Sequence, residues 1–331
     1  MRKLVSIQEV KEVNPIENAD AIEVVKVLGW SVVTKKGEFK KGDKVVYAEI
    51  DSLFPEKEEF EFLRNSKFRI RTVKLRGQVS QGICFPLSIL PKGNYKIGDD
   101  VTEIIGVTKY EPPIPACLSG KMKGPFPSFI QKTDETRIQN LQERLTKFKG
   151  TKCVYSEKLD GTSSTFYINN GEFGVCSKNL ELHEDEDNTF WQIAKRYNIE
   201  SKLRSLGKNI AIQGEIIGEG IQSNKYKLEK NERDLYLFNI FDIDNYSYLG
   251  YEDFIEFAEK LELKTVPFID LDFTLTDDID YLVELSKGVS KLNNKVKREG
   301  IVIRSYEEIN DMGERVSFKS INPDWLIKYK E

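Results

Sequence analysis

The sequence is poor in the residues that most often bind transition metals or transfer protons. It holds one histidine, His183, and four cysteines that are scattered singly, with no CxxC pair. Neither a zinc site nor a disulfide framework is therefore expected. Because a single histidine excludes most histidine-based chemistry, any catalysis must use lysine, carboxylates and a metal ion held by oxygen ligands.

Long apolar runs are also lacking. No segment approaches the roughly 18 apolar residues of a membrane-spanning helix, and the first ten residues, MRKLVSIQEV, contain no apolar stretch of signal-peptide length. Apolar residues make up 39% and charged residues 31% of the chain, which is ample material for buried cores. We expect a soluble, cytoplasmic protein with no membrane partner, and the length of 331 residues favours two domains.

A strong net charge is the third absence. The value of −4 argues against a protein that coats nucleic acid, but the charge is unevenly distributed. Residues 1–110 contain 19 Lys+Arg and 16 Asp+Glu, so this part is positive while the remainder is negative. Six basic residues and no acidic residue occur between positions 64 and 76: Arg64, Lys67, Arg69, Arg71, Lys74 and Arg76. They form either a phosphate-binding strip or the solvated surface of a strand and loop.

Short strands are the pattern that the first hundred residues do contain. The segments LVSIQEV, IEVVKVLGWSVVTK, DKVVYAEI, FRIRTVKL and QGICFPL are rich in β-branched residues and are bounded by Gly, Pro, Asn and Asp. About five strands in about a hundred residues fit an oligonucleotide/oligosaccharide-binding (OB) barrel, a fold that often grips nucleic-acid backbones. Other small barrels fit this spacing nearly as well. We assign residues 1–108 to an OB-like domain.

Composition changes after this domain. Five prolines and two glycines fall within residues 111–129, which predicts a linker over residues 109–131. Residues 132–331 then alternate strand patterns with helical ones, and we expect helices over residues 133–148, 189–206, 251–261 and 279–289. The predicted fold class is α+β, with a small N-terminal β-barrel followed by a domain of sheets and flanking helices.

The most informative segment is residues 157–162, EKLDGT, which places Lys158 at a strand end, Asp160 two residues later and then Gly161. A lysine attacks a phosphate only as a neutral amine, and a nearby metal ion or cation favours that form. Asp160 could help to hold such a metal, and Gly161 would allow a sharp turn beside a nucleotide. Alone, the string is weak, because similar strings occur in ordinary solvated turns.

Four further strings follow in order along the chain. They are residues 213–222 (QGEIIGEGIQ), 235–243 (LYLFNIFDI), 298–304 (REGIVIR) and 316–322 (VSFKSIN). With residues 157–162 they resemble, in order, motifs I, III, IIIa, IV and V of the covalent nucleotidyltransferase superfamily, which comprises DNA ligases, RNA ligases and mRNA capping enzymes. Five ordered matches are far more specific than any single one.

The resemblance implies a role for each motif. Lys158 would be the nucleophile that forms a lysyl-AMP, and Lys319 would contact the α-phosphate. Glu215 would contact the ribose or a metal-bound water, and Glu299 would help to hold the catalytic metal. The implied metal site comprises Asp160, Glu215 and Glu299. Phe241 would stack on adenine, and the other residues expected at the nucleotide are Glu157, Arg137, Lys178 and Arg304.

The order of the domains indicates which branch of the superfamily the chain resembles. DNA ligases and capping enzymes carry an OB domain after motif V, whereas twelve residues follow Lys319 here and the candidate barrel lies at the other end. This plan looks like that of the Naegleria-type RNA ligases, and residues 214–222 are similar to the RNA ligase 2 branch. In those proteins an arginine about twenty residues before the nucleophile matters, and Arg137 occupies that place.

The chain departs from the RNA ligase 2 pattern at two positions. Motif V of that branch carries two lysines in a KxK pattern, and here the second position is Ile321, a contact that Lys328 could replace. The branch also has an arginine about twenty residues after the nucleophile that handles polynucleotide ends, and this chain has Lys178. A lysine keeps the charge but loses the bidentate fork of a guanidinium.

The resemblance therefore implies an ATP-dependent RNA ligase whose second domain has the ATP-grasp-like antiparallel sheets of nucleotidyltransferases. ATP and Mg²⁺ or Mn²⁺ would be its cofactors, and its partner would be RNA with 3′-hydroxyl and 5′-phosphate ends, contacted in part by the barrel. We expect a monomer that functions in RNA repair. The alternatives are a DNA ligase or capping-type guanylyltransferase, and a relative that binds nucleic acid without catalysis.

Overall fold

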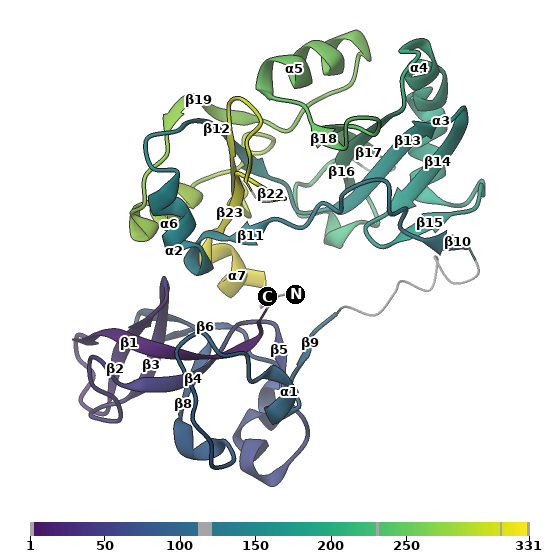
Figure 1. The fold of residues 1–331 in the computed structure, drawn as a ribbon. Helices are drawn as coiled ribbons and strands as arrows, with labels where there is room; N and C mark the ends of the chain where they lie inside the picture. Colours follow the sequence, from purple (N-terminus) through teal and green to yellow (C-terminus); the bar gives the residue numbers. More distant parts are fainter. Residues whose placement is uncertain (1–2, 112–120, 230–231, 312, 330–331) are drawn as a thin grey trace. The chain divides into compact units, whose positions relative to one another are not determined.

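Strands predominate in the structure, as the β-branched and aromatic segments predict. The computed structural model describes residues 3–111, 121–229, 232–311 and 313–329. The chain divides into two units: unit 1 comprises residues 1–113, 139–142 and 323–331, and unit 2 comprises residues 114–138 and 143–322 (Figure 1). Residues 112–120 of the predicted linker lie outside the described residues.

Unit 1 is built on an antiparallel sheet with the strand order β3-β2-β1-β4-β8. Its strands are β1 (Val5–Pro15), β2 (Ile22–Val27), β3 (Trp30–Lys35), β4 (Lys44–Ala48) and β8 (Ile83–Pro86). The first half of β1 pairs with β4 and the second half with β2, and the register shifts between Val10 and Glu12. Because such a bulge bends a strand and increases its twist, the sheet curls around a core that includes Ile7 and Trp30.

Short elements complete the barrel of unit 1. They are β5 (Ser52–Leu53) paired with β9 (Thr108–Lys109), the hairpin of β6 (Thr72–Leu75) and β7 (Gln78–Gln81), and the helices η1 (Glu58–Ser66), η2 (Leu87–Ile89) and α1 (Thr102–Ile105). The predicted basic strip, residues 64–76, therefore runs from the end of η1 through a loop into β6.

Unit 1 also takes in two segments that are remote in sequence. Helix α7 (Pro323–Tyr329) packs beside β6 and buries Trp325 and Leu326. Residues 139–142 join the same unit, where Trp30 Nε1 donates to Asn140 Oδ1 at 2.6 Å and Asn140 Nδ2 donates to Glu49 Oε1 at 2.7 Å. The unit is thus not one continuous stretch of sequence, although the pattern of strands alone suggested residues 1–108.

Unit 2 contains two sheets. The seven-stranded antiparallel sheet has the order β10-β15-β14-β13-β16-β17-β18, from β10 (Met122–Pro125), β13 (Thr162–Asn169), β14 (Glu172–Ser177), β15 (Leu180–Leu182), β16 (Ile210–Gly218), β17 (Arg233–Asp242) and β18 (Ser247–Tyr248). The five-stranded sheet has the order β11-β23-β20-β12-β19, from β11 (Thr136–Arg137), β12 (Lys152–Lys158), β19 (Phe268–Thr274), β20 (Gly300–Ser305) and β23 (Ser317–Ile321). A small hairpin joins β21 (Asn310–Asp311) to β22 (Glu314–Arg315).

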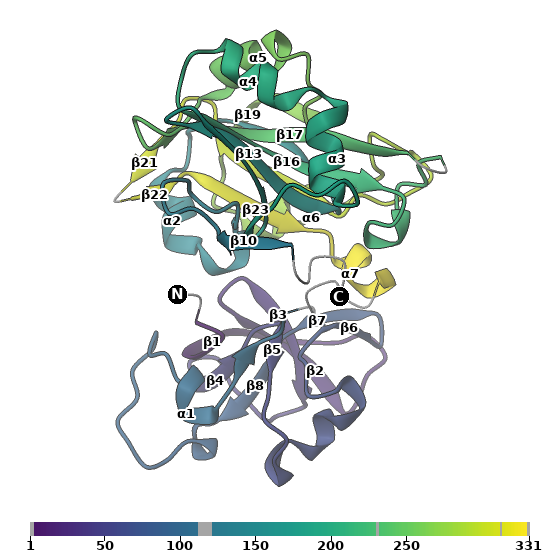
Figure 2. The ribbon, with the colours of Figure 1, turned by 90° about the vertical axis from the view of Figure 1, so that its right-hand side faces the viewer.

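The helices of unit 2 are short. They are α2 (Gln142–Lys147), α3 (Thr189–Arg196), α4 (Ile199–Ser205), α5 (Tyr251–Lys260) and α6 (Ile279–Ser286), with the 3₁₀ turn η5 (Gln222–Asn224). The turn η4 (Ile138–Asn140) lies mostly within residues 139–142, which belong to unit 1. Helices α3, α4 and α5 cover one face of the seven-stranded sheet, where Phe190 and Leu203 pack on Ile212 and Leu237 (Figure 2). The opposite face meets the five-stranded sheet around Leu159, Ile217, Tyr226 and Val266.

The predicted helices agree with the structure in part. Helix α5 and the start of α6 lie where expected, and residues 189–206 form α3 and α4 with a break at Asn198, whose φ of 51° is left-handed. The helix predicted over residues 133–148 is wrong in its first half, because residues 136–137 pair with β23 as strand β11. No helix in the described part of the chain is long and apolar enough to cross a membrane.

Candidate active site

The central strands of the five-stranded sheet bring motifs I, IV and V together. Lys158 ends β12 opposite Gly300, the first residue of β20, and β20 pairs with β23, which carries Lys319. Glu299 immediately precedes β20, and the Nζ atom of Lys158 lies 2.7 and 2.8 Å from its two carboxylate oxygens. Residues 141 positions apart in sequence therefore form a partly buried ion pair at one end of the sheet.

Motif III reaches the same place from the seven-stranded sheet. Strand β16 pairs with β13, and Glu215 Oε1 accepts a hydrogen bond from the backbone N–H of Gly161 at 2.9 Å. A side chain at Gly161 could not be accommodated, because a Cβ atom there would lie 2.3 Å from the carbonyl oxygen of Ile216. Gly161 is therefore required for close packing of motif I on β16, and not for the turn that the sequence suggested.

Three carboxylates surround one lysine at this position. Burial alone would lower the pKa of Lys158, but the negative charges of Glu299, Glu215 and Asp160 outweigh burial and raise it. Burial raises the pKa of Glu215 to about 8. The charge of Lys158 lowers this pKa, whereas the charges of Glu299 and Asp160 raise it. The carboxylates that raise the pKa of Lys158 would also attract a divalent cation. The donors are all oxygen atoms, which suit Mg²⁺ or Mn²⁺.

Each predicted metal ligand has a protein partner in this structure. Asp160 Oδ2 lies 2.7 Å from the Nζ atom of Lys225, an ion pair that is almost fully buried. The backbone N–H of Asp160 donates to the hydroxyl of Tyr226 at 2.8 Å. Within the described residues, no three Asp, Glu, His or Cys side chains are close enough together to hold a metal ion. The carboxylates fit a metal by their chemistry and charge, while their present partners are Lys158, Lys225 and Gly161.

Positive charge gathers beside this carboxylate group. Arg137 on β11 is in register with Lys319 on the parallel strand β23. Burial lowers the pKa of Lys319 to about 7. The charge of Asp134 raises this pKa, whereas the charges of Arg137, Lys158 and Lys178 lower it. Four cations from four separate segments therefore lie near one another, an arrangement that suits the binding of phosphate groups.

Comparisons with known proteins show which family the chain resembles. Residues 4–87 match a model of an OB-fold domain, and residues 151–321 match the RNA ligase family. A structure of a Naegleria gruberi RNA ligase mutant with ATP and Mn is 41% identical, with a TM-score of 0.91 over 99% of both chains. The chain belongs to the RNA ligase family.

Two further structures of the Naegleria enzyme show the same likeness. The RNA ligase with PPi is 42% identical, with a TM-score of 0.90, and the match covers 100% of this chain and 99% of that one. A mutant with AMP and Mn is 42% identical, with a TM-score of 0.91 over 99% of both chains. No curated protein matches the chain. The family and the α+β fold class predicted from the motifs, an OB-fold domain followed by a nucleotidyltransferase domain, are confirmed.

Two residues predicted at the nucleotide site of this RNA ligase are placed elsewhere. Glu157 is on the opposite face of β12 from Lys158, because side chains alternate along a strand, and its buried carboxylate accepts from the backbone N–H of Lys291 at 2.7 Å. Phe241 is fully buried, with its ring against Tyr246 and Tyr248. Its ring faces are not accessible to a base, so the prediction that Phe241 stacks on adenine needs correction.

The aromatic residue that sequence analysis missed is Phe238. The register of β16 and β17 shifts so that Gln213 faces Asn239 and Gly214 faces Leu237, which leaves Phe238 as the extra residue of a bulge. Its ring lies 6.0 Å from the guanidinium of Arg304 and packs, partly exposed, on the side of Leu159 and Tyr226. The motif indicated this strand, and the bulge sets the direction of Phe238, which packs with Tyr236 on the cluster that contains Leu159.

The remaining predicted residues take secondary positions. Arg304 is buried and pairs with Glu135, with Nη2 3.2 Å from Oε1. Ile321 is buried in β23 and offers no charge, and Lys328 lies on α7 of unit 1. Asp134, Lys225 and Tyr226 contact residues of the candidate site, but none of them belongs to the five motif strings. Asp134 lies three residues before the predicted Arg137.

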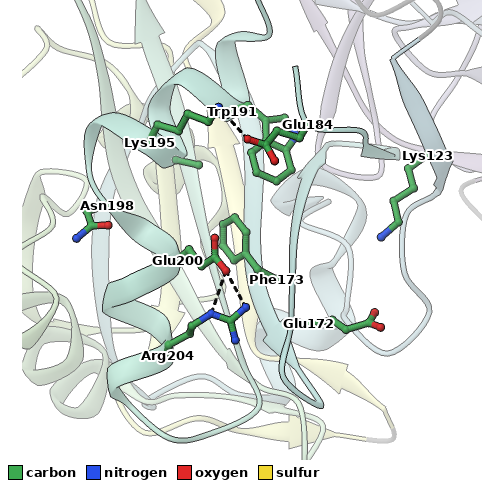
Figure 3. Close-up of a pocket in the computed structure, with 10 residues that line it drawn as sticks. Lys123, Glu172, Phe173, Glu184, Trp191, Lys195, Asn198, Glu200 and Arg204 are labelled. Atoms are coloured by element: carbon green, nitrogen blue, oxygen red, sulfur yellow. Dashed lines mark hydrogen bonds and ion pairs between the residues drawn. The ribbon is translucent and has the colours of Figure 1, made fainter. Parts of the chain in front are cut away.

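A separate hollow of about 510 Å³ is lined by residues of strands β10 and β14 and of helices α3 and α4 (Figure 3). Phe173 and Trp191 pack edge to face within it, with ring centroids 5.7 Å apart. Its charged groups pair locally, Lys195 with Glu184 at 2.8 Å and Arg204 with Glu200 at 2.7 Å. The described residues that line it include no predicted nucleotide ligand, so this hollow is distinct from the candidate active site.

Proposed function

We propose that this chain is an ATP-dependent RNA ligase that seals 3′-hydroxyl and 5′-phosphate ends through a lysyl-AMP on Lys158. The observation that carries the proposal is the position of Lys158, partly buried between three carboxylates and beside a group of cations. The similar Naegleria structures contain ATP, AMP or PPi, which are the substrate, the transferred group and the product of the first step.

In that step the Nζ atom of Lys158 attacks the α-phosphorus of ATP, a P–N bond forms, and the bond to pyrophosphate breaks. The amine must first lose a proton, because an ammonium group has no lone pair. Asp160, Glu215 and Glu299 would hold the divalent metal, which supplies positive charge for these carboxylates and for the triphosphate. Burial of Lys158 favours the neutral amine once the carboxylate charge is balanced.

The cations on the other side of Lys158 would neutralise the phosphates of ATP. Lys319 is assigned to the α-phosphate, and Arg137 lies beside it on the neighbouring strand. Phe238 is assigned to the adenine face, with Arg304 behind it. Phosphoryl transfer depends mainly on such positioning and charge neutralisation, so these residues would contribute by orientation.

The later steps use the same group of residues. AMP passes from Lys158 to the 5′-phosphate of RNA, and a 3′-hydroxyl then attacks that phosphate and releases AMP. Lys178 is assigned to the RNA ends because it stands at the solvent side of the cations, with a half-exposed side chain.

A sealing assay tests the function. We expect the purified protein, with ATP and Mg²⁺ or Mn²⁺, to join RNA that carries a 3′-hydroxyl and a 5′-phosphate, and to leave RNA with a 5′-hydroxyl unjoined, because only a phosphate can accept AMP. Joined RNA is measured by denaturing gel electrophoresis. DNA ends and GTP are run in parallel. Joining of DNA but not RNA, or labelling by GTP instead of ATP, would contradict the proposal.

We propose that the barrel contacts RNA. The basic residues of positions 64–76 differ in whether their charge is already paired within the barrel. Arg69 pairs with Asp51 at 2.6 Å and lies 3.9 Å from the ring centroid of Tyr110. Arg64 pairs with Glu61 at 2.7 Å. These two arginines have internal partners. The hairpin of β6 and β7 instead exposes Lys74 and Arg76 together with the apolar side chains of Val73 and Leu75.

Replacing Lys74 and Arg76 together by glutamine is expected to weaken RNA binding about tenfold and to slow the sealing of pre-adenylylated RNA. Loss of two contacts to single-stranded RNA should reduce the slope of log K against log salt by roughly 1.4. Adenylylation of Lys158 should not change. The measurements are RNA binding across a salt series and single-turnover sealing. The matched control replaces the exposed Lys40 and Lys41 of the same unit by glutamine, and equal losses in both variants would refute a specific role for the hairpin.

A further inference from the structure

Asp134 is the acidic residue that faces the group of cations in the candidate active site. Its Oδ1 atom lies 3.2 Å from the Nζ atom of Lys178 and 3.8 Å from that of Lys319. Among the charges that act on Lys319, the largest that favours its protonated form is the carboxylate of Asp134. One carboxylate therefore bridges the lysine assigned to the RNA ends and the lysine assigned to the α-phosphate.

The residues on both sides of Asp134 contact the two sheets of unit 2. Thr133 Oγ1 lies 3.0 Å from Ser163 Oγ on β13. Glu135 Oε1 accepts from Arg304 Nη2 on β20 at 3.2 Å, and residues 136–137 pair with β23. Asp134 is thus held between two anchored neighbours, and its placement opposite the lysines does not depend on a free loop.

The exposure of the three side chains distinguishes this contact from an ordinary surface ion pair. The side chain of Lys319 is 19% exposed, whereas those of Asp134 and Lys178 are about half exposed, at 52% and 50%. The carboxylate therefore lies at the open side of a largely buried cation. A carboxylate oxygen only accepts hydrogen bonds when ionised, as a phosphate oxygen does, so the two compete for the same ammonium groups.

We propose, on the basis of the proposed function, that Asp134 is a resident counter-anion of the phosphate site, which binds Lys178 and Lys319 in the ligand-free protein and gives way to a phosphoryl group. Asp134 thereby holds the two amino groups in place before the substrate arrives. It also weakens the binding of every phosphate that enters, including the pyrophosphate product. Faster release of pyrophosphate would favour the forward reaction.

The test measures the binding of inorganic pyrophosphate to the full-length protein and to Asp134→Asn by titration calorimetry at fixed pH and ionic strength. We expect the variant to bind about three- to tenfold more tightly, because a partly exposed charge near the ligand is removed without loss of volume. Pyrophosphate should also inhibit self-adenylylation of the variant at a correspondingly lower concentration, and the KM for ATP should fall while kcat does not rise. Asp134→Glu, which keeps the charge, should remain close to the wild type.

The matched control is Asp272→Asn in the same unit. Asp272 is exposed and lies 4.0 Å from the Nζ atom of Lys152, so the same charge is removed away from the site. Equal or weaker pyrophosphate binding by Asp134→Asn, in a protein whose wild type labels with ATP, would overturn the role of Asp134 alone. Tighter binding by both asparagine variants would also overturn it, because a general charge effect would then suffice. A wild type that neither labels with ATP nor binds pyrophosphate would overturn the proposed function as well.

Discussion

Replacing Lys158 by alanine is expected to reduce covalent labelling from α-labelled ATP by roughly a thousandfold or more, an effect of about 4 kcal/mol on the activation free energy. Lys158 is the lysine that lies between Glu299 and Glu215 at the end of β12. The measurement is radioactivity retained by the protein after denaturing electrophoresis.

Lys319 is the rival nucleophile in this experiment. Its pKa of about 7 leaves much of its amine neutral at pH 8, and it lies in the same sheet. Labelling that survives Lys158→Ala but disappears in Lys319→Ala would transfer the covalent role to Lys319. The control is Lys152→Ala, which removes an exposed lysine from the other end of β12 and should leave labelling unchanged.

Replacing Glu299 by glutamine is expected to reduce adenylylation by about a hundredfold at low Mg²⁺, with partial recovery at saturating Mn²⁺. The substitution removes one of three carboxylates proposed to hold the metal, and it preserves side-chain volume. Initial rates of self-adenylylation across a metal series measure the effect. Glu307→Gln, an exposed position just after β20, is the control and should match the wild type. Rates near those of the wild type at low Mg²⁺ would show that Glu299 is structural.

The same variant makes a prediction about pH. Among the charges that act on Lys158, Glu299 is the largest that raises its pKa, so its removal lowers that pKa and increases the neutral fraction of the amine at any given pH. The slower reaction of Glu299→Gln should therefore reach its maximum at a lower pH than that of the wild type. An unchanged profile would mean that Lys158 and Glu299 do not form their ion pair in solution.

The ion pairs of the site explain how three acidic side chains are tolerated without a metal. Buried carboxylates are costly unless they are paired or hydrogen-bonded. Glu299 forms an ion pair with Lys158, and Asp160 forms one with Lys225. Glu215 accepts a hydrogen bond from the backbone N–H of Gly161. Asp134 pairs with two of the cations, Lys178 and Lys319. The carboxylates and the cations of the site therefore both have partners within the chain.

The barrel also affects how these experiments should be designed. Because α7 belongs to unit 1, deleting residues 1–110 would uncover Trp325 and Leu326, which follow β23 closely in sequence. Loss of activity in such a truncation would not separate RNA contact from loss of stability. Surface substitutions on the hairpin of β6 and β7 leave that packing intact.

The sequence alone was enough to predict the family, and it gave candidates for the reacting residues. The five ordered strings resemble the motifs of the family, and this resemblance pointed to Lys158, Asp160, Glu215, Glu299 and Lys319. The α+β class followed from hydrophobic periodicity, since that pattern is local.

Only the tertiary structure decided which neighbouring side chains face the site. Phe238 packs beside Leu159 because a bulge in β17 changes the alternation of the strand. Residues 136–137 form a strand because β23 offers them a partner. Arg69 pairs with Asp51, whereas the described contacts give no such partner to Lys74 or Arg76. Asp134 lies opposite two lysines from distant segments. The direction of a side chain on a strand depends on register and pairing, which are set by contacts between segments far apart in sequence.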